Sequence, residues 1–212
     1  MSAPALIFFG FTVTFASFDW LMSLDPHWYS SISGVYFFAG TIVSYFAVQG
    51  LLKAPRQLTA EHRHGLGKLL FGFVCFWAYI AFSQYLLISY ANLPEETIWY
   101  RHRFDGTWLG LSAFLAVGHF VLPFFYLLPQ GMKKNKNLLA AGSAWLLLMH
   151  YLDLYWVVMP NFHTDGIYSL DAATLAGATA LLSGAYLLLS KRTEEIPISD
   201  PRLAESLGFD NA

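Results

Sequence analysis

The chain has 212 residues, of which 56% are hydrophobic, 18% aromatic and only 12% charged, and its formal net charge is -2. Because soluble domains carry about 25% charged residues, this composition excludes an ordinary soluble domain and indicates an integral membrane protein. The sequence offers no basic patch for nucleic acid, and its single cysteine, Cys75, excludes internal disulfides, cysteine-based iron–sulfur sites and covalent c-type haem.

Six apolar segments are long enough to cross a hydrocarbon core about 30 Å thick, which takes about 20 helical residues. In chain order they lie near residues 4–24, 32–52, 68–90, 106–128, 138–159 and 170–190. Short connections with turn or helix-breaking residues separate them. The sequence therefore predicts an all-α integral membrane protein. Its fold is a bundle of six transmembrane helices within residues 1–192, followed by a polar tail over 193–212.

Lysine and arginine are distributed unevenly between the two sets of connections. One set and the tail hold ten of them: Lys53, Arg56, Arg63, Lys68, Lys133, Lys134, Lys136, Lys191, Arg192 and Arg202. The other set holds only Arg101 and Arg103. Since cytoplasmic loops are enriched in lysine and arginine, both termini and the tail are predicted to be cytoplasmic. The cytoplasmic cations are expected to lie in solvated loops and to set this topology.

The first predicted span ends in a cluster of acidic, histidine and aromatic side chains. Asp19 lies inside the outer end of the span, where a carboxylate is costly to bury. We interpret it either as an interfacial carboxylate that caps the second helix or as one that handles protons or contacts quinol. Asp25 followed by Pro26 is predicted to start the second helix as its N-cap and first residue. His27 then belongs to an interfacial aromatic belt, with proton relay as the alternative.

The fifth predicted span carries His150 and Asp153, which are three residues apart and therefore share one helix face. A carboxylate and an imidazole attract each other strongly at low dielectric constant, so the pair is predicted to handle protons, with a packing hydrogen bond as the alternative. His119, near the middle of the fourth span, is a further candidate. It is interpreted as a hydrogen-bonding residue between helices or, with His150, as an axial ligand of b-type haem. The spacing of the side chains predicts no metal site.

A compact group of charges, Arg101, His102, Arg103 and Asp105, is predicted to form an outer loop. A plain solvated loop is one interpretation. Because the rest of the outer face is poor in charge, a docking surface for a peripheral subunit is the other.

Several stretches of the chain resemble one family of membrane proteins. They are FDWLMSLDPHWYSS at 18–31 with GVYFFAG at 34–40, WAYIAFSQY at 77–85, NLPEE at 92–96 and DPRLAESL at 200–207. The chain resembles the NrfD-like membrane subunits of alternative complex III, a quinol:cytochrome c oxidoreductase. It is most similar to the member often described as the second quinone-binding protein of that complex. Family members are longer and the resemblance is to their C-terminal part, so the chain is expected to be a fragment or a split subunit.

The resemblance implies a subunit of a multi-subunit respiratory complex in the bacterial inner (cytoplasmic) membrane. Its expected partners are iron–sulfur, haem c and other NrfD-like membrane subunits, together with membrane lipid. Quinone or quinol is the implied substrate, no covalently bound cofactor is expected, and the isolated chain is not expected to be active. Two alternatives stay open: a structural scaffold without a catalytic role, and a membrane protein that translocates protons or a solute.

Overall fold

The computed structural model describes residues 2–52, 59–163, 168–189 and 201–208, and these ranges are helical, without a strand. The long helices are α1 (Ser2–Trp20), α2 (Ser33–Leu52), α3 (Ala60–Ala91), α8 (Lys136–Val158) and α9 (Ser169–Leu189). A further long helix consists of α5 (Gly106–Leu115), the π-helical turn η2 (Ala116–Val121) and α6 (Leu122–Leu127). The short elements are η1 (Met22–Leu24), α4 (Pro94–Arg103), α7 (Gln130–Lys134), η3 (Met159–Asn161) and α10 (Leu203–Leu207). Most of the polar tail and four cations of the topology count, Lys53, Arg56, Lys191 and Arg192, lie outside the described residues.

Six helical stretches are long and apolar enough to cross a membrane, which confirms the predicted number. Their bounds are Pro4–Leu24, Ser33–Leu52, Ala60–Ala91, Gly106–Leu127, Lys136–Asn161 and Ser169–Leu188. The third helix begins earlier than the predicted span, at Ala60 rather than near residue 68. Thr59 explains this start, because its side chain accepts a hydrogen bond from the His62 backbone N–H and caps the helix.

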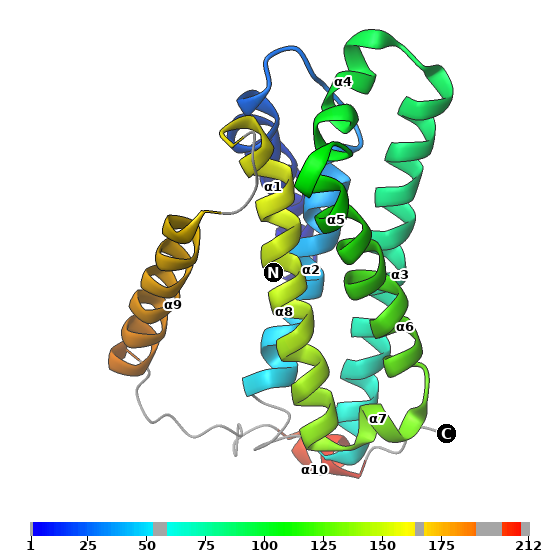
Figure 1. Cartoon of the computed structure of the whole chain (residues 1–212). Coiled ribbons are helices and arrows are strands. Elements are labelled where there is room, and N and C mark those ends of the chain that lie inside the picture. The colour runs from blue at the N-terminus through cyan, green and yellow to red at the C-terminus, as the bar shows by residue number, and fades with distance from the viewer. Residues whose placement is uncertain (1, 53–58, 164–167, 190–200, 209–212) are drawn as a thin grey trace.

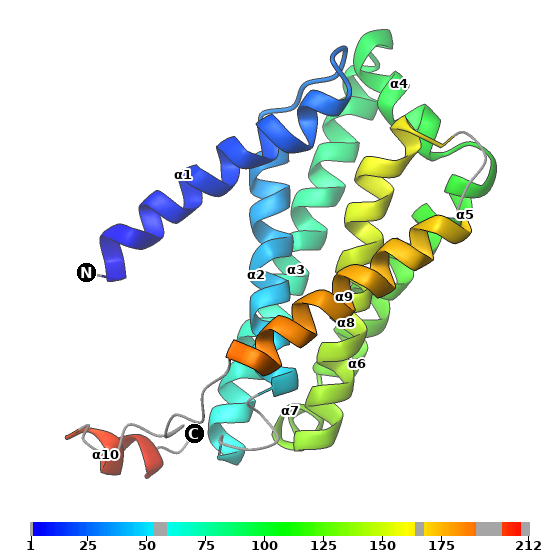
Figure 2. The same ribbon diagram turned by 90° about the vertical axis from the view of Figure 1, so that its left-hand side faces the viewer.

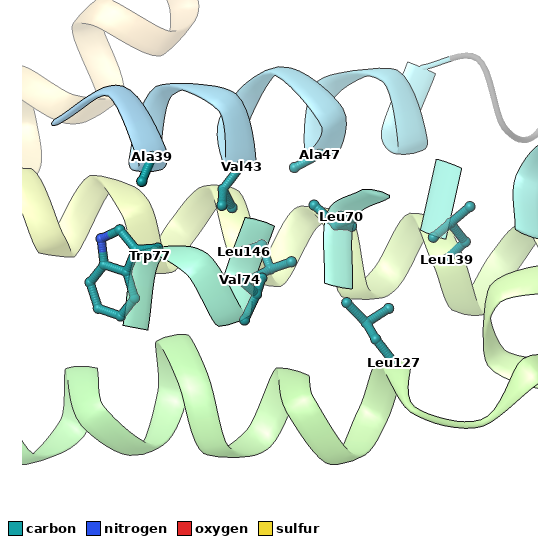
Figure 3. Packing of buried hydrophobic residues seen from close by; sticks show 9 residues of the cluster. All are labelled: Ala39, Val43, Ala47, Leu70, Val74, Trp77, Leu127, Leu139 and Leu146. Atoms are coloured by element: carbon teal, nitrogen blue, oxygen red, sulfur yellow. The ribbon is translucent and has the colours of Figure 1, made fainter. Parts of the chain in front are cut away.

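The centre of the bundle is formed by α2, α3, α6 and α8 (Figure 1). The buried side chains that meet there are Ala39, Val43, Ala47, Leu70, Val74, Trp77, Leu127, Leu139 and Leu146 (Figure 3). The three residues from α2 are small and recur every fourth position, so the backbone of α2 lies close to its neighbours. At Gly50 the approach is closest, since a Cβ atom there would lie 2.2 Å from Ser143 Oγ. Such close backbone contact is the main source of helix association in lipid.

Helices α1 and α9 lie at the edges of the bundle (Figure 2). α1 diverges from α2 toward its N-terminus, and the two are in close contact at Gly34, where a Cβ atom would lie 2.4 Å from the Thr14 side chain. α9 stands apart, and after Asp171 its described residues are exposed or half-buried. Its first turn is joined to α8 by Asp171, which accepts a hydrogen bond from the Tyr155 hydroxyl at 2.7 Å. The apolar sides of α1 and α9 are therefore open to lipid or to other membrane proteins.

The connection between α1 and α2 corrects the prediction that Asp25 and Pro26 start a helix. Asp25 ends η1 instead, and α2 begins only at Ser33. The Asp25 carboxylate accepts the His27 backbone N–H at 3.3 Å, and this local turn competes with helix formation.

The segment before α5 corrects the predicted outer loop, because it is the helix α4. Its first turn holds Pro94 and two acidic residues, and its last turn holds three basic residues that end in Arg103. Acidic side chains at the start and basic ones at the end are the distribution that the helix dipole favours. Asp105 then caps α5, since its carboxylate accepts the Gly106 backbone N–H at 2.9 Å.

Arg103 is fully buried, so it does not belong to the predicted docking surface. Its guanidinium donates hydrogen bonds to the backbone carbonyls of Trp99 at 2.9 Å, Trp156 at 3.1 Å and Val157 at 2.6 Å. The last two carbonyls lie at the end of α8, where the helix dipole favours a cation. Burial lowers the pKa of Arg103 to about 9, which is still above neutral pH, so the side chain stays cationic. Arg103 therefore joins α4 to the end of α8.

Lys133 is buried as well, which corrects its prediction as a solvated loop residue. Its ammonium group donates to the carbonyls of Leu127 at 2.6 Å and Leu128 at 3.0 Å, at the end of α6. Its side chain packs on α3 at Gly67, where a Cβ atom would lie 2.6 Å away. Burial, with a contribution from Lys68, lowers the pKa of Lys133. Buried cations thus close helix ends at both ends of the bundle.

Replacing Arg103 by methionine keeps much of the side-chain volume but removes the three hydrogen bonds to backbone carbonyls. Because a hydrogen bond to a charged group contributes about 1.5–3 kcal/mol, and buried carbonyls would be left without donors, we expect Arg103→Met to destabilise the fold by about 3 kcal/mol or more. Arg101→Met, at an exposed position of the same helix, is the matched control and should change stability by no more than about 0.5 kcal/mol. Thermal unfolding in detergent measures both, and equal stability of the two variants would contradict the role of Arg103.

Candidate functional site

Asp153 is the most deeply buried carboxylate that the structure describes, with 1% of its surface exposed. It projects from α8 between α2 and α3. The Tyr36 hydroxyl of α2 donates a short hydrogen bond to Oδ1, and the Trp77 indole N–H of α3 donates to Oδ2 at 3.2 Å. Since a buried carboxylate is costly without such partners, both of its oxygens are satisfied by side chains from other helices.

His150 lies one turn before Asp153 and on the same face of α8. Its Nδ1 atom is 3.7 Å from Asp153 Oδ2, which is an ion-pair distance but too long for a hydrogen bond. The imidazole packs directly on α2 at Gly40, where a Cβ atom would lie 2.4 Å from the ring Cε1. Only a residue without a side chain leaves room for His150 at this helix crossing.

His119 adds a second imidazole next to this pair. Its ring stacks on Trp77 with centroids 3.8 Å apart, and its centroid is 6.3 Å from that of His150. Both ring nitrogens of His119 are buried and have no hydrogen-bond partner among the described residues. One face of the ring is covered by Trp77. The contacts of His119 are thus those of a packed core residue.

The π-helical turn η2 carries His119 and has a local cause. Pro123 lacks a backbone N–H and so cannot complete the helical hydrogen-bond pattern one turn earlier. The chain widens at this point, and the Gly118 carbonyl accepts the Trp145 indole N–H of α8 at 2.7 Å. Wide turns of this kind are frequent at functional sites.

A cavity of about 860 Å³ lies between α1, α2, α3, α5 and α8, within the bundle. His150 and Asp153 line it together with Tyr36 and Trp77. Its other walls are mainly apolar and aromatic, and Trp28 and Trp99 stack in its lining at 4.4 Å. Small-molecule sites measure about 300–1,000 Å³ and combine apolar walls with a few polar groups, so this cavity has the size and chemistry of such a site.

The candidates from the sequence are distributed unevenly with respect to this cavity. His150 and Asp153 lie together on its wall, as their spacing predicts. His119 is next to the cavity but is not among its lining residues. Asp19 and His27 are exposed and also do not line it. The structure therefore brings His150 and Asp153 together in the cavity, places His119 beside it, and leaves Asp19 and His27 at the α4 end of the bundle.

Tyr36 and Trp77 are cavity residues that the sequence does not reveal. Each is one aromatic residue among many in an apolar helix. Their partner Asp153 is 117 and 76 positions away in the chain, so no local spacing connects them. Gly40 gives a weak signal, since a glycine inside an apolar helix marks a close backbone approach.

The described residues contain no group of three or more histidine, cysteine, aspartate or glutamate side chains placed to hold a metal ion. In comparisons with known proteins, no family model and no curated protein matched the chain. The assignment of a function therefore depends on the cavity and on the residues around it.

Replacing Gly40 by alanine tests the contact between α2 and His150. Because the added methyl group would overlap the imidazole, we expect Gly40→Ala to destabilise the fold by about 1–3 kcal/mol. Gly72→Ala on α3 is the matched control: its Cβ atom would meet nothing within 4 Å, and alanine is favoured over glycine in a helix by up to about 1 kcal/mol. Thermal unfolding in detergent should therefore give shifts of opposite sign, and a Gly40→Ala variant as stable as the parent would contradict the contact.

Proposed function

We propose that this chain is a membrane subunit of a quinol:electron-acceptor oxidoreductase complex and that its cavity binds the quinol ring. The observation that carries the proposal is the buried pair of His150 and Asp153 on the wall of an 860 Å³ cavity between transmembrane helices. Ionisable residues inside a membrane protein are rare and usually mark a path for protons, ions or substrates.

The chemistry of the cavity suits a quinol. A quinol has a flat aromatic ring, which aromatic walls accommodate, and two hydroxyl groups, which need proton acceptors when the ring is oxidised. In the proposed step His150 accepts a proton from one hydroxyl, and Asp153 stabilises the imidazolium that forms. Tyr36 and Trp77 are positioning residues, because their hydrogen bonds fix the Asp153 carboxylate.

Oxidation of one quinol to quinone releases two protons and two electrons. The protons pass to groups on this chain, and the electrons pass to redox centres in partner subunits. The resemblance to NrfD-like subunits supports such partners, namely iron–sulfur, haem c and other membrane subunits in a bacterial inner membrane. The unburied helix α9 offers an apolar surface on which a neighbouring membrane protein or lipid would pack.

We further propose that both termini are cytoplasmic. The support is the uneven distribution of lysine and arginine between the two sets of connections in the sequence, ten residues against two. In this orientation the cavity lies toward the outer half of the membrane, near α4, and protons released there have a short way to the outer surface.

Replacing Asp153 by asparagine tests the proton-handling role. Asparagine keeps the shape of the side chain but cannot stabilise an imidazolium, so we expect quinol:acceptor activity of the assembled complex to fall by about 10²-fold or more. Tyr36→Phe removes one hydrogen bond to the carboxylate and should lower the activity less. Glu205→Gln, the same type of change at an exposed carboxylate of α10, should leave the activity unchanged.

The Asp153→Asn complex and an uptake assay together distinguish the alternatives. Unchanged activity of the Asp153→Asn complex would exclude the catalytic role and favour a structural scaffold. Proton or solute uptake by the chain alone in vesicles, without any quinol-dependent activity in its complex, would favour a translocating protein.

Reporter fusions test the orientation. We expect green fluorescent protein at the C-terminus to fluoresce and alkaline phosphatase at the same position to be inactive, because both would lie in the cytoplasm. Insertion of either reporter after Asn92, between α3 and α4, should give the reverse result, and an active phosphatase at the C-terminus would contradict the proposed topology.

A further inference from the structure

The exposed residues that line the cavity gather on one side of it. Its exposed lining residues belong to α3, to the start of the following span and to Phe104 between them; they are Tyr79, Phe82, Tyr85, Phe104, Leu109, Ala113 and Ala116. The lining residues from α1, α2 and α8 are buried or half-buried. The opening is therefore a slot between α3 and the line of α5 and η2, and α3 contacts this line at η2 and α6.

Aromatic contacts close this slot at its α4 end and at its α7 end. At the α4 end, Tyr85 contacts Phe104 with ring centroids 5.5 Å apart and Tyr100 at 5.3 Å. At the α7 end, Phe71 contacts Phe124 at 5.3 Å. Between these contacts the lining runs along α3 from Cys75 to Tyr85, a rise of about 15 Å. Since α3 and α5 are both spanning helices, the slot faces the side of the bundle and not either aqueous end.

Most residues that form the walls of the slot are apolar, and several have small side chains. Ala78 on α3 faces the cavity, as do Ala113 and Ala116 on the other side. His150 and Asp153 lie at the far, inner side of the cavity and are almost completely buried, and Gln84 on α3 and Ser112 on α5 are further polar residues of the lining. A ligand that fills both regions needs a polar ring at the inner side and an apolar chain that leads out to the lipid.

We infer that the slot between α3 and the α5–η2 line is the lateral entrance of the cavity and holds the hydrocarbon tail of a lipid-soluble ligand. The identity of the ring as a quinol rests on the proposed function, whereas the entrance rests only on the geometry. A ligand dissolved in the bilayer would thus reach Asp153 from the side without crossing water.

A lipid-soluble carbodiimide tests the entrance without any quinone, because such reagents condense with carboxylic acids in apolar surroundings. We expect dicyclohexylcarbodiimide to modify Asp153 in nanodiscs, as mapped by peptide mass spectrometry, and Ala116→Trp to slow this modification about tenfold by narrowing the slot. Val117→Trp is the matched control, since it adds the same side chain at the next, exposed position outside the cavity lining and should leave the rate unchanged. Ala113→Trp provides a second obstruction, and comparable unfolding temperatures confirm that the variants fold.

Equal rates in the Ala116, Ala113 and Val117 variants would overturn the entrance, and so would the absence of Asp153 modification in all of them.

A second experiment tests the assignment of the tail by measuring how well quinones protect Asp153 from modification in the Val117→Trp protein. A benzoquinone with a polyprenyl tail should protect Asp153 about tenfold better than the same ring without a tail. Equal protection by both would overturn the tail assignment. Protection by neither would overturn quinone as the occupant, and with it the proposed function, while the rates without quinone still decide the entrance.

Discussion

A carboxylate inside a membrane protein has to obtain its hydrogen bonds from the protein, because the surrounding hydrocarbon supplies none. Asp153 obtains them from Tyr36 on α2 and from Trp77 on α3, although it belongs to α8. Three helices are thereby fixed around one polar group. The small residues of α2 serve the same arrangement, since they bring its backbone near enough for the Tyr36 hydroxyl to reach the carboxylate. The cavity lies beside this polar group, and α5 forms a further part of its wall.

The same rule operates at the ends of the bundle. Arg103 and Lys133 are buried cations whose partners are carbonyls at the ends of α8 and α6. Each replaces water at a helix terminus and anchors a short helix, α4 or α7, against a long one. Because Trp99 and Tyr100 of α4 line the cavity, the hydrogen bonds of Arg103 also hold one wall of the candidate site in place.

The sequence predicts those features that depend on neighbouring residues in the chain. The spanning helices can be predicted because each is a continuous run of apolar residues in the chain. The pairing of His150 with Asp153 can be predicted because residues three apart in a helix lie on the same face. Tyr36 and Trp77 are missed because their contact with Asp153 is a product of tertiary packing. The burial of Arg103 is missed for the same reason, since its local charge pattern is that of any exposed helix end. Asp25 and Pro26 mislead because the local turn at His27 replaces the expected helix start. The proton-handling roles of Asp19, His27 and His119 stay predictions.

The wide turn η2 has a consequence for the length of its span. It contains about one residue more per turn than the α-helix on either side, because the Leu122 backbone N–H donates to the Val117 carbonyl and not to that of Gly118. Deleting one residue between Ala116 and Val121 would therefore restore a regular α-helix and leave α5 and α6 facing nearly the same way as before. The Gly118 carbonyl would return to the helical hydrogen-bond pattern and would no longer be free to accept the Trp145 indole N–H. This span should thus tolerate the loss of one residue at this turn better than a deletion elsewhere, at the expense of its contact with α8.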